Sequence, residues 1–136
     1  MTTMVPVLEH VDHIHVHVSD RNSAETWYAD VLGLRRDPKL EQWSHATGGP
    51  LMLKNPTGTI MLAIFEHPRQ ICRSTIAFNV HAAQFLAWKS HLTVVLDGQI
   101  KLADHHLSWS IYFTDPYDNP YEITCYEYAT LAGTMQ

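Results

Sequence analysis

An internal repeat constrains this chain more than any other feature of its sequence. Residues 12–18 and 74–80 both alternate apolar and polar side chains, which predicts two β-strands. When the two segments are aligned, three pairs of apolar residues coincide: Ile14 with Ile76, Val16 with Phe78, and Val18 with Val80. The offset is 62 residues. Short alternating strands are common and can match by coincidence, so the repeat depends on the elements that follow each strand.

A helix is predicted directly after each of these strands. Segment 21–32 has apolar residues at helical spacing, Ser19 and Asp20 as N-cap candidates, and Gly33 as the residue that ends it. Segment 81–92 has the same spacing at Ala82, Phe85, Leu86 and Leu92. The order of strand and helix is therefore the same in both halves.

Three extended segments are predicted after each helix. They are 34–37, 43–54 and 58–65 in the first half, and 93–102, 108–114 and 120–128 in the second. Each half thus reads β-α-β-β-β, which indicates two fused copies of one module packed into one sheet system. We expect an α+β fold and a single domain over residues 1–136, with modules at about 8–67 and 73–130.

Composition and charge exclude several classes of protein. The chain has 136 residues, 46% of them hydrophobic and 17% charged, as in a globular protein. A formal net charge of −5 without a cluster of Lys and Arg argues against nucleic-acid binding. The longest apolar run, 61–65, is too short to cross a membrane. No signal peptide is recognisable, and Cys72 and Cys125 lack disulfide-scaffold spacing, so we expect a cytoplasmic protein.

Three histidines occupy alternate positions of the first strand. Side chains of a strand alternate between its two faces, so His13, His15 and His17 share one face. Residues two apart in a strand are about 6.5 Å apart along it, which lets two imidazoles converge on one ion. The stripe is compatible with a metal site, an acid/base cluster or an ordinary polar face.

Two stretches resemble the vicinal-oxygen-chelate superfamily, which includes glyoxalases, bleomycin resistance proteins and extradiol dioxygenases. VDHIHVHVSDRNSAETWYADVLGL (11–34) resembles its opening strand and helix, and SIYFTDPYDNPYEIT (110–124) its closing hairpin. In the closing stretch Asp118 replaces a turn glycine, which is acceptable because Asp visits the left-handed region. The resemblance implies paired βαβββ modules whose curved mixed sheets form a half-barrel pocket, often completed by a homodimer.

The resemblance also implies a divalent metal, Fe, Mn, Ni or Zn, held by histidine and glutamate with open positions for two substrate oxygens. His13 falls on the first ligand position and Glu122 on the last. Thr75 stands where the second histidine belongs, and Leu62 or Ala63 stands where a second carboxylate would be. His15 is the candidate to replace the missing ligand, whereas His17 and Thr75 are expected to line the pocket.

A second set of candidates lies near the C-terminus. In the dioxygenase-like reading of HHLSWSIYFTDPYDNPYE (105–122), His105 is the acid/base, Tyr112 donates to a substrate oxygen and Glu122 binds the metal. Tyr126 has the strand parity of Glu122 and is expected to line the same pocket. The missing histidine at Thr75 leaves the ligand set for ring cleavage incomplete.

Two functions therefore remain open. One is metal-dependent chemistry of the glyoxalase or dioxygenase kind on a small molecule chelated at His13 and Glu122. The other is metal-free binding of a small molecule in the same pocket, as in the bleomycin-resistance proteins.

Overall fold

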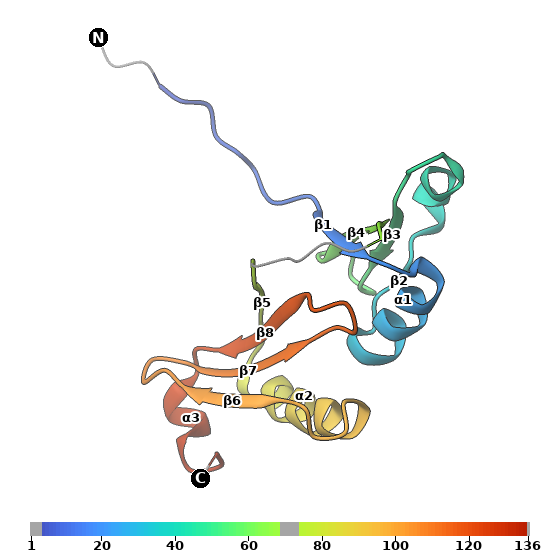
Figure 1. Ribbon diagram of the computed structural model, residues 1–136. Coiled ribbons are helices and arrows are strands. Elements are labelled where there is room, and N and C mark those ends of the chain that lie inside the picture. The colour runs from blue at the N-terminus through green and yellow to red at the C-terminus, as the bar shows by residue number, and fades with distance from the viewer. Residues whose placement is uncertain (1–3, 69–73, 136) are drawn as a thin grey trace.

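The two halves of the chain form two four-stranded mixed sheets, which face each other as separate layers in Figure 1. The computed structural model describes residues 4–68 and 74–135. The first sheet has the order β1-β4-β3-β2 and the second the order β5-β8-β7-β6. In each sheet the first strand of the half runs parallel to the last, and the other pairs are antiparallel. The sheets do not close into a barrel.

The first half contains four strands and three helical segments. Its elements are β1 (Ile14–Val18), α1 (Arg21–Trp27), the π-helical turn η1 (Tyr28–Leu32), β2 (Arg35–Arg36), the 3₁₀ helix η2 (Pro38–His45), β3 (Leu51–Lys54) and β4 (Met61–Glu66). Asp20 caps α1 by accepting a hydrogen bond from the Ser23 amide, and Gly33 ends η1 at φ 69°. Both residues act as the sequence predicts.

The second half repeats this order. Its elements are β5 (Ile76–Asn79), α2 (Ala82–Val95), β6 (Lys101–Asp104), β7 (Trp109–Thr114), β8 (Pro120–Cys125) and α3 (Tyr128–Ala132). Asp118, at φ 67°, adopts the left-handed conformation expected for the turn between β7 and β8. Among the described residues, no helix combines the length and apolar character needed to cross a bilayer.

Strand register confirms the repeat and the α+β fold class. His15 pairs with Ala63 in the first sheet, and Ala77 pairs with Glu122 in the second. Because His15 and Ala77 are 62 residues apart, Ala63 and Glu122 are equivalent positions. The predicted offset therefore places every strand of one half on its counterpart.

Three predicted extended segments are wrong in part. Residues 43–45 belong to η2, which begins at Asp37 because the Asp37 carboxylate accepts a hydrogen bond from the Lys39 amide and Pro38 fixes the first turn. The β-branched run 93–95 continues α2, which ends only at the turn of Asp97 and Gly98. In both places a tertiary or capping interaction outweighs local strand propensity.

The third difference lies at the end of β8. The strand stops at Cys125 instead of 128, because Glu127 turns back toward the start of α2. Its carboxylate accepts a hydrogen bond from the Ala82 amide at 2.6 Å. His81, the N-cap residue of α2, makes no side-chain cap of its own, so Glu127 takes over that role.

A buried hydrogen-bond network joins the two halves. The Tyr28 hydroxyl, from η1, donates to the Asp115 carboxylate at 2.6 Å and lies 2.7 Å from the Tyr121 hydroxyl of β8. The Asn119 amide donates both to Asp115 and to the main-chain carbonyl of His17 in β1. Tyr28 and Tyr121 are both fully buried in a core cluster that draws on both halves.

Removing one hydroxyl from this network should destabilise the whole chain. We predict that Tyr28→Phe lowers the free energy of unfolding by about 1–3 kcal/mol, since it leaves buried partners in Asp115 and Tyr121 with fewer bonds. Urea denaturation followed by circular dichroism measures this. Tyr126→Phe, at a tyrosine that is 67% exposed, is the matched control and should change nothing. Equal stability of the two variants would contradict the role of the network.

The same network should make stability fall at alkaline pH. Burial, followed by the neighbouring Tyr121 and Asp115, raises the pKa of Tyr28 far above its ordinary value of 10.0. The neutral phenol therefore stabilises the fold fully below pH 10, and this contribution is lost as the pH rises further. Each proton involved corresponds to about 1.4 kcal/mol per pH unit.

Denaturation curves between pH 9 and pH 11 test this expectation. Tyr28→Phe should lose stability less steeply than the wild type, by about one proton's share of the slope, while Tyr126→Phe should follow the wild type. Parallel pH profiles for the wild type and Tyr28→Phe would contradict it.

Candidate functional site

The second sheet has one face covered by α2 and one open face that carries polar side chains. Tyr121, Ile123 and Cys125 of β8 are buried in the core, so Pro120, Glu122 and Thr124 point the other way. Register places Tyr112 opposite Glu122 and Ser110 opposite Thr124. The open face therefore gathers Glu122, Tyr112 and Ser110 from two neighbouring strands.

Hydrogen bonds link these side chains into one set. The Ser110 hydroxyl donates to Glu122 Oε2 at 2.7 Å and lies 3.2 Å from Thr124 Oγ1. The Tyr112 hydroxyl lies 2.9 Å from His105 Nε2. His105, Tyr112 and Glu122, which the sequence groups together, thus lie together on this face.

Tyr112 is held in its neutral form. Partial burial and then the neighbouring Glu122 carboxylate raise the pKa of Tyr112 above its ordinary value. Its phenol can therefore donate a hydrogen bond at neutral pH, and the His105 imidazole beside it can accept or supply a proton. This is the arrangement that general acid–base chemistry requires.

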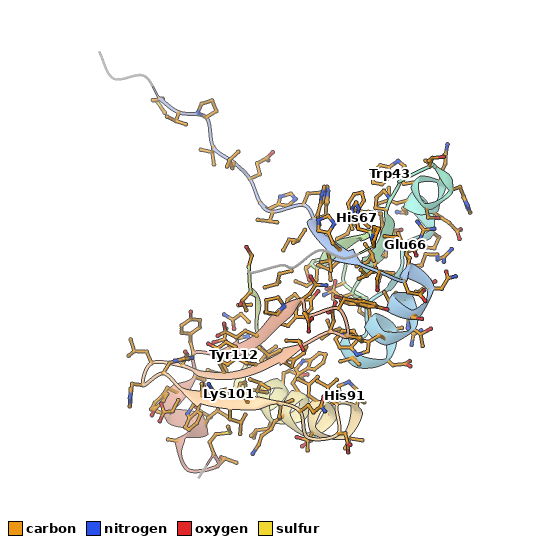
Figure 2. All side chains as sticks on the ribbon, viewed as in Figure 1. Trp43, Glu66, His67, His91, Lys101 and Tyr112 are labelled. Atoms are coloured by element: carbon orange, nitrogen blue, oxygen red, sulfur yellow. The ribbon has the colours of Figure 1, made fainter. Side chains whose placement is uncertain are left out.

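Lys101 adds a positive charge to this face. It pairs with Tyr112 across β6 and β7, and Figure 2 shows Lys101 and Tyr112 on these neighbouring strands. The sequence alone gives no reason to place a basic residue here, because the 93–102 segment was expected to be a single extended run. Ser110 was also missed, although its strand parity with Tyr112 could have found it.

The open face of the first sheet carries the histidine stripe. His13 Nε2 lies 3.2 Å from His15 Nε2, and His13 Nδ1 lies 2.8 Å from the Asp12 carboxylate. The His15 ring also packs on Phe65 of β4, with centroids 4.7 Å apart. His13 and His15 therefore form a pair, whereas Asp12 was not foreseen as a partner.

His17 lies farther along the same stripe. Its ring packs against Phe65 and His67, with the His67 centroid 4.9 Å away (Figure 2 labels His67). Burial, then His67 and His15, lower the pKa of His17, which keeps its imidazole neutral. The Nδ1 atom of His17 is buried and has no hydrogen-bond partner in the described part of the chain.

The two open faces remain separate sites within one chain. Among residues 4–68 and 74–135, no three His, Cys, Asp or Glu side chains are grouped closely enough to hold a metal ion. His13 and Glu122 lie on different sheets, and Thr75 is an exposed residue immediately before β5. Tyr126 lies one residue beyond β8, exposed, away from the strand that would have aimed it.

Two cavities lie between the halves. The larger, of about 260 Å³, is lined mainly by apolar residues, among them Ile60, Phe78 and Trp88. The smaller, of about 130 Å³, brings Asp12 and His13 next to Ala77, the residue paired with Glu122. Only the smaller cavity therefore borders a predicted site residue.

Comparison with known proteins shows similarity in structure alone. No protein-family model matches the sequence, and no curated protein matches it either. A glyoxalase family protein from Bacillus anthracis is similar with a TM-score of 0.68 at 21% identity, covering 91% of this chain and 100% of that one. A glyoxalase/dioxygenase from Nostoc punctiforme has a TM-score of 0.62 at 21% identity, covering 90% and 98%.

A third similar structure is a mutant of the fosfomycin resistance protein FosX from Listeria monocytogenes. It was crystallised with Mn(II) and 1S,2S-dihydroxypropylphosphonic acid. Its TM-score is 0.68 at 13% identity, with 88% of this chain and 93% of that chain covered. All three neighbours are vicinal-oxygen-chelate proteins, and the paired modules described above therefore give this chain the fold of that superfamily.

Proposed function

We propose that the chain is an enzyme that acts on a small oxygen-bearing molecule at the open face of the second sheet. The observation that carries this proposal is the hydrogen-bonded set of His105, Tyr112, Ser110 and Glu122. A neutral phenol between an imidazole and a carboxylate suits proton transfer to or from a substrate hydroxyl or carbonyl.

Each residue has a distinct role in this proposal. Tyr112 donates a hydrogen bond to a substrate oxygen, and His105 exchanges the proton with that oxygen through Tyr112 or directly. Ser110 holds the Glu122 carboxylate in one orientation. Lys101 attracts an anionic group on the substrate, such as a phosphonate or carboxylate, across from Tyr112.

A divalent metal forms the second part of the proposal. The FosX crystals with Mn(II) support it, and His13 and Glu122 are the ligands that the resemblance implies. When bound, such an ion acts as a Lewis acid that polarises substrate oxygens. The described residues of one chain hold no three-ligand set, so the donors that fit an ion directly are His13 and His15.

A homodimer would bring the open faces of two chains within reach of each other. Two features support this assembly. Neither open face is covered by a helix of its own half, apart from the contact of η2 with β3. The segment before β1 extends away from the fold in Figure 1, with five exposed apolar residues: Met4, Val5, Val7, Leu8 and Val11.

We further propose that modules 8–67 and 73–130 work as one domain in the cytoplasm. The single domain is supported by the core cluster, which draws on both halves, and by the bonds that join Tyr28 to Asp115. The cytoplasmic location is supported by Cys125, which is buried as a free thiol.

Metal-free binding is the second candidate. The observation in its favour is the absence of a three-ligand group within residues 4–68 and 74–135. In that case the same polar face would hold a ligand of the bleomycin-resistance type by hydrogen bonds and would transform nothing.

Turnover assays separate the two candidates. The probes are the hemithioacetal of methylglyoxal and glutathione, catechol, and fosfomycin, each with and without added Mn²⁺. We expect turnover of at least one probe, with kcat/KM reduced about 10²–10³-fold in Tyr112→Phe and Glu122→Gln. Tyr126→Phe and the exposed Glu9→Gln serve as matched controls and should keep wild-type rates.

Failure of the enzyme proposal would have a clear signature. Turnover that survives both Tyr112→Phe and Glu122→Gln unchanged would remove the acid–base face from the mechanism. Saturable binding of a probe by the wild type, weakened by these variants but without turnover, would establish the binding protein instead.

A further inference from the structure

We infer that His13 and His15 form a two-histidine chelate for a late first-row divalent metal, supported by Asp12 and independent of Glu122. This inference rests on the metal-dependent part of the proposed function and specifies its ligands. It departs from the set of His13 and Glu122 that the resemblance implies.

The separation of the two nitrogens carries the inference. His13 Nε2 and His15 Nε2 are 3.2 Å apart. A tetrahedral ion bound to two imidazole nitrogens at about 2.0–2.1 Å each places them about 3.3 Å apart, and a right-angle arrangement places them about 2.9 Å apart. The observed distance lies between these two values, so an ion can replace the shared proton with little movement of either ring.

Asp12 fixes the form of His13 that binds metal. Its carboxylate lies 2.8 Å from His13 Nδ1, which favours the tautomer with the proton on Nδ1. The lone pair of Nε2 then points toward His15. A carboxylate on the far nitrogen of a metal-binding histidine is the usual outer support of such sites, where it orients the ring and raises its basicity.

Neighbouring contacts hold the second ring in place. The His15 ring stacks on His13, with centroids 5.1 Å apart, and packs on Phe65 of β4. Both imidazoles come from adjacent odd positions of one strand edge, so the register of β1 with β4 fixes their spacing. The pair is thus set by the sheet and not by a loose surface loop.

The donor set defines the class of metal. Neutral imidazoles suit Zn²⁺, Ni²⁺, Cu²⁺ and Co²⁺ better than the oxygen-preferring Mg²⁺ or Ca²⁺. Two protein ligands leave at least two coordination positions for water or for the oxygens of a bound molecule. Because Asp12 and His13 border the cavity beside Ala77, those positions open toward the space between the halves.

Metal titration of variants tests this site directly. Full-length protein is stripped with EDTA, dialysed and titrated with Zn²⁺ and with Ni²⁺ by calorimetry, and bound metal is counted by mass spectrometry. We expect one ion per chain in the wild type and at least 100-fold weaker binding in His13→Ala and in His15→Ala. Asp12→Asn should weaken binding about 10-fold, as loss of an outer carboxylate does.

Matched controls locate the ion. Glu122→Gln removes the other implied ligand, and His106→Ala removes an exposed histidine from a turn. Both should bind Zn²⁺ within twofold of the wild type. Thermal unfolding of each variant, with His13→Gln as a second substitution, checks that lost binding does not reflect lost folding.

Three results would overturn the inference. They are a wild type that binds neither metal, a His15→Ala variant that binds like the wild type, and a Glu122→Gln variant that loses the ion. The third result would move the metal to Glu122. In each case the turnover of Tyr112→Phe and Glu122→Gln still decides the acid–base face on its own, so the two proposals can fail separately.

Discussion

The buried bond between the Tyr28 hydroxyl and the Asp115 carboxylate is the contact on which the arrangement of the two halves depends. A carboxylate inside a core is costly unless every lone pair is used. Asp115 meets this requirement by accepting bonds from Tyr28, from the Asn119 side chain and from two amides of its own turn. The turn between β7 and β8 is therefore folded correctly only when the helix of the first half is in place.

The same turn reaches the histidine strand. The Asn119 side chain donates to the main-chain carbonyl of His17, so the turn that follows the Tyr112 strand also anchors β1. Both candidate faces thus hang on one short polar segment that contains no candidate ligand. This explains why the core network and the sites cannot be treated as independent features of the chain.

The sequence is most informative where two patterns agree. The offset of 62 residues, the caps at Asp20 and Gly33, and the left-handed turn at Asp118 were all predictable, because each depends on local chemistry repeated in both halves. The grouping of His105, Tyr112 and Glu122 was also predictable, since strand parity and register follow from the same repeat. Their chemical roles remain proposals.

Other features depend on contacts that no local pattern reveals. The cap that Glu127 supplies to α2, and with it the early end of β8, comes from a residue 45 positions away from Ala82. Asp37 and Pro38 favoured η2 locally, but the apolar residues beside them suggested a strand. The partnership of Asp12 with His13 is adjacent in sequence, yet only the turn of the His13 ring shows which nitrogen it contacts.

The register of the two sheets has a consequence for any molecule held between them. Equivalent backbone positions carry different chemistry: His13 corresponds to Thr75, and Ala63 corresponds to Glu122. The backbone is nearly two-fold symmetric, whereas the donors are segregated, with imidazoles on one sheet and a phenol and carboxylate on the other. A bound molecule would thus meet unlike ends and fit in one orientation only, which is a source of stereochemical selectivity that the fold by itself does not supply.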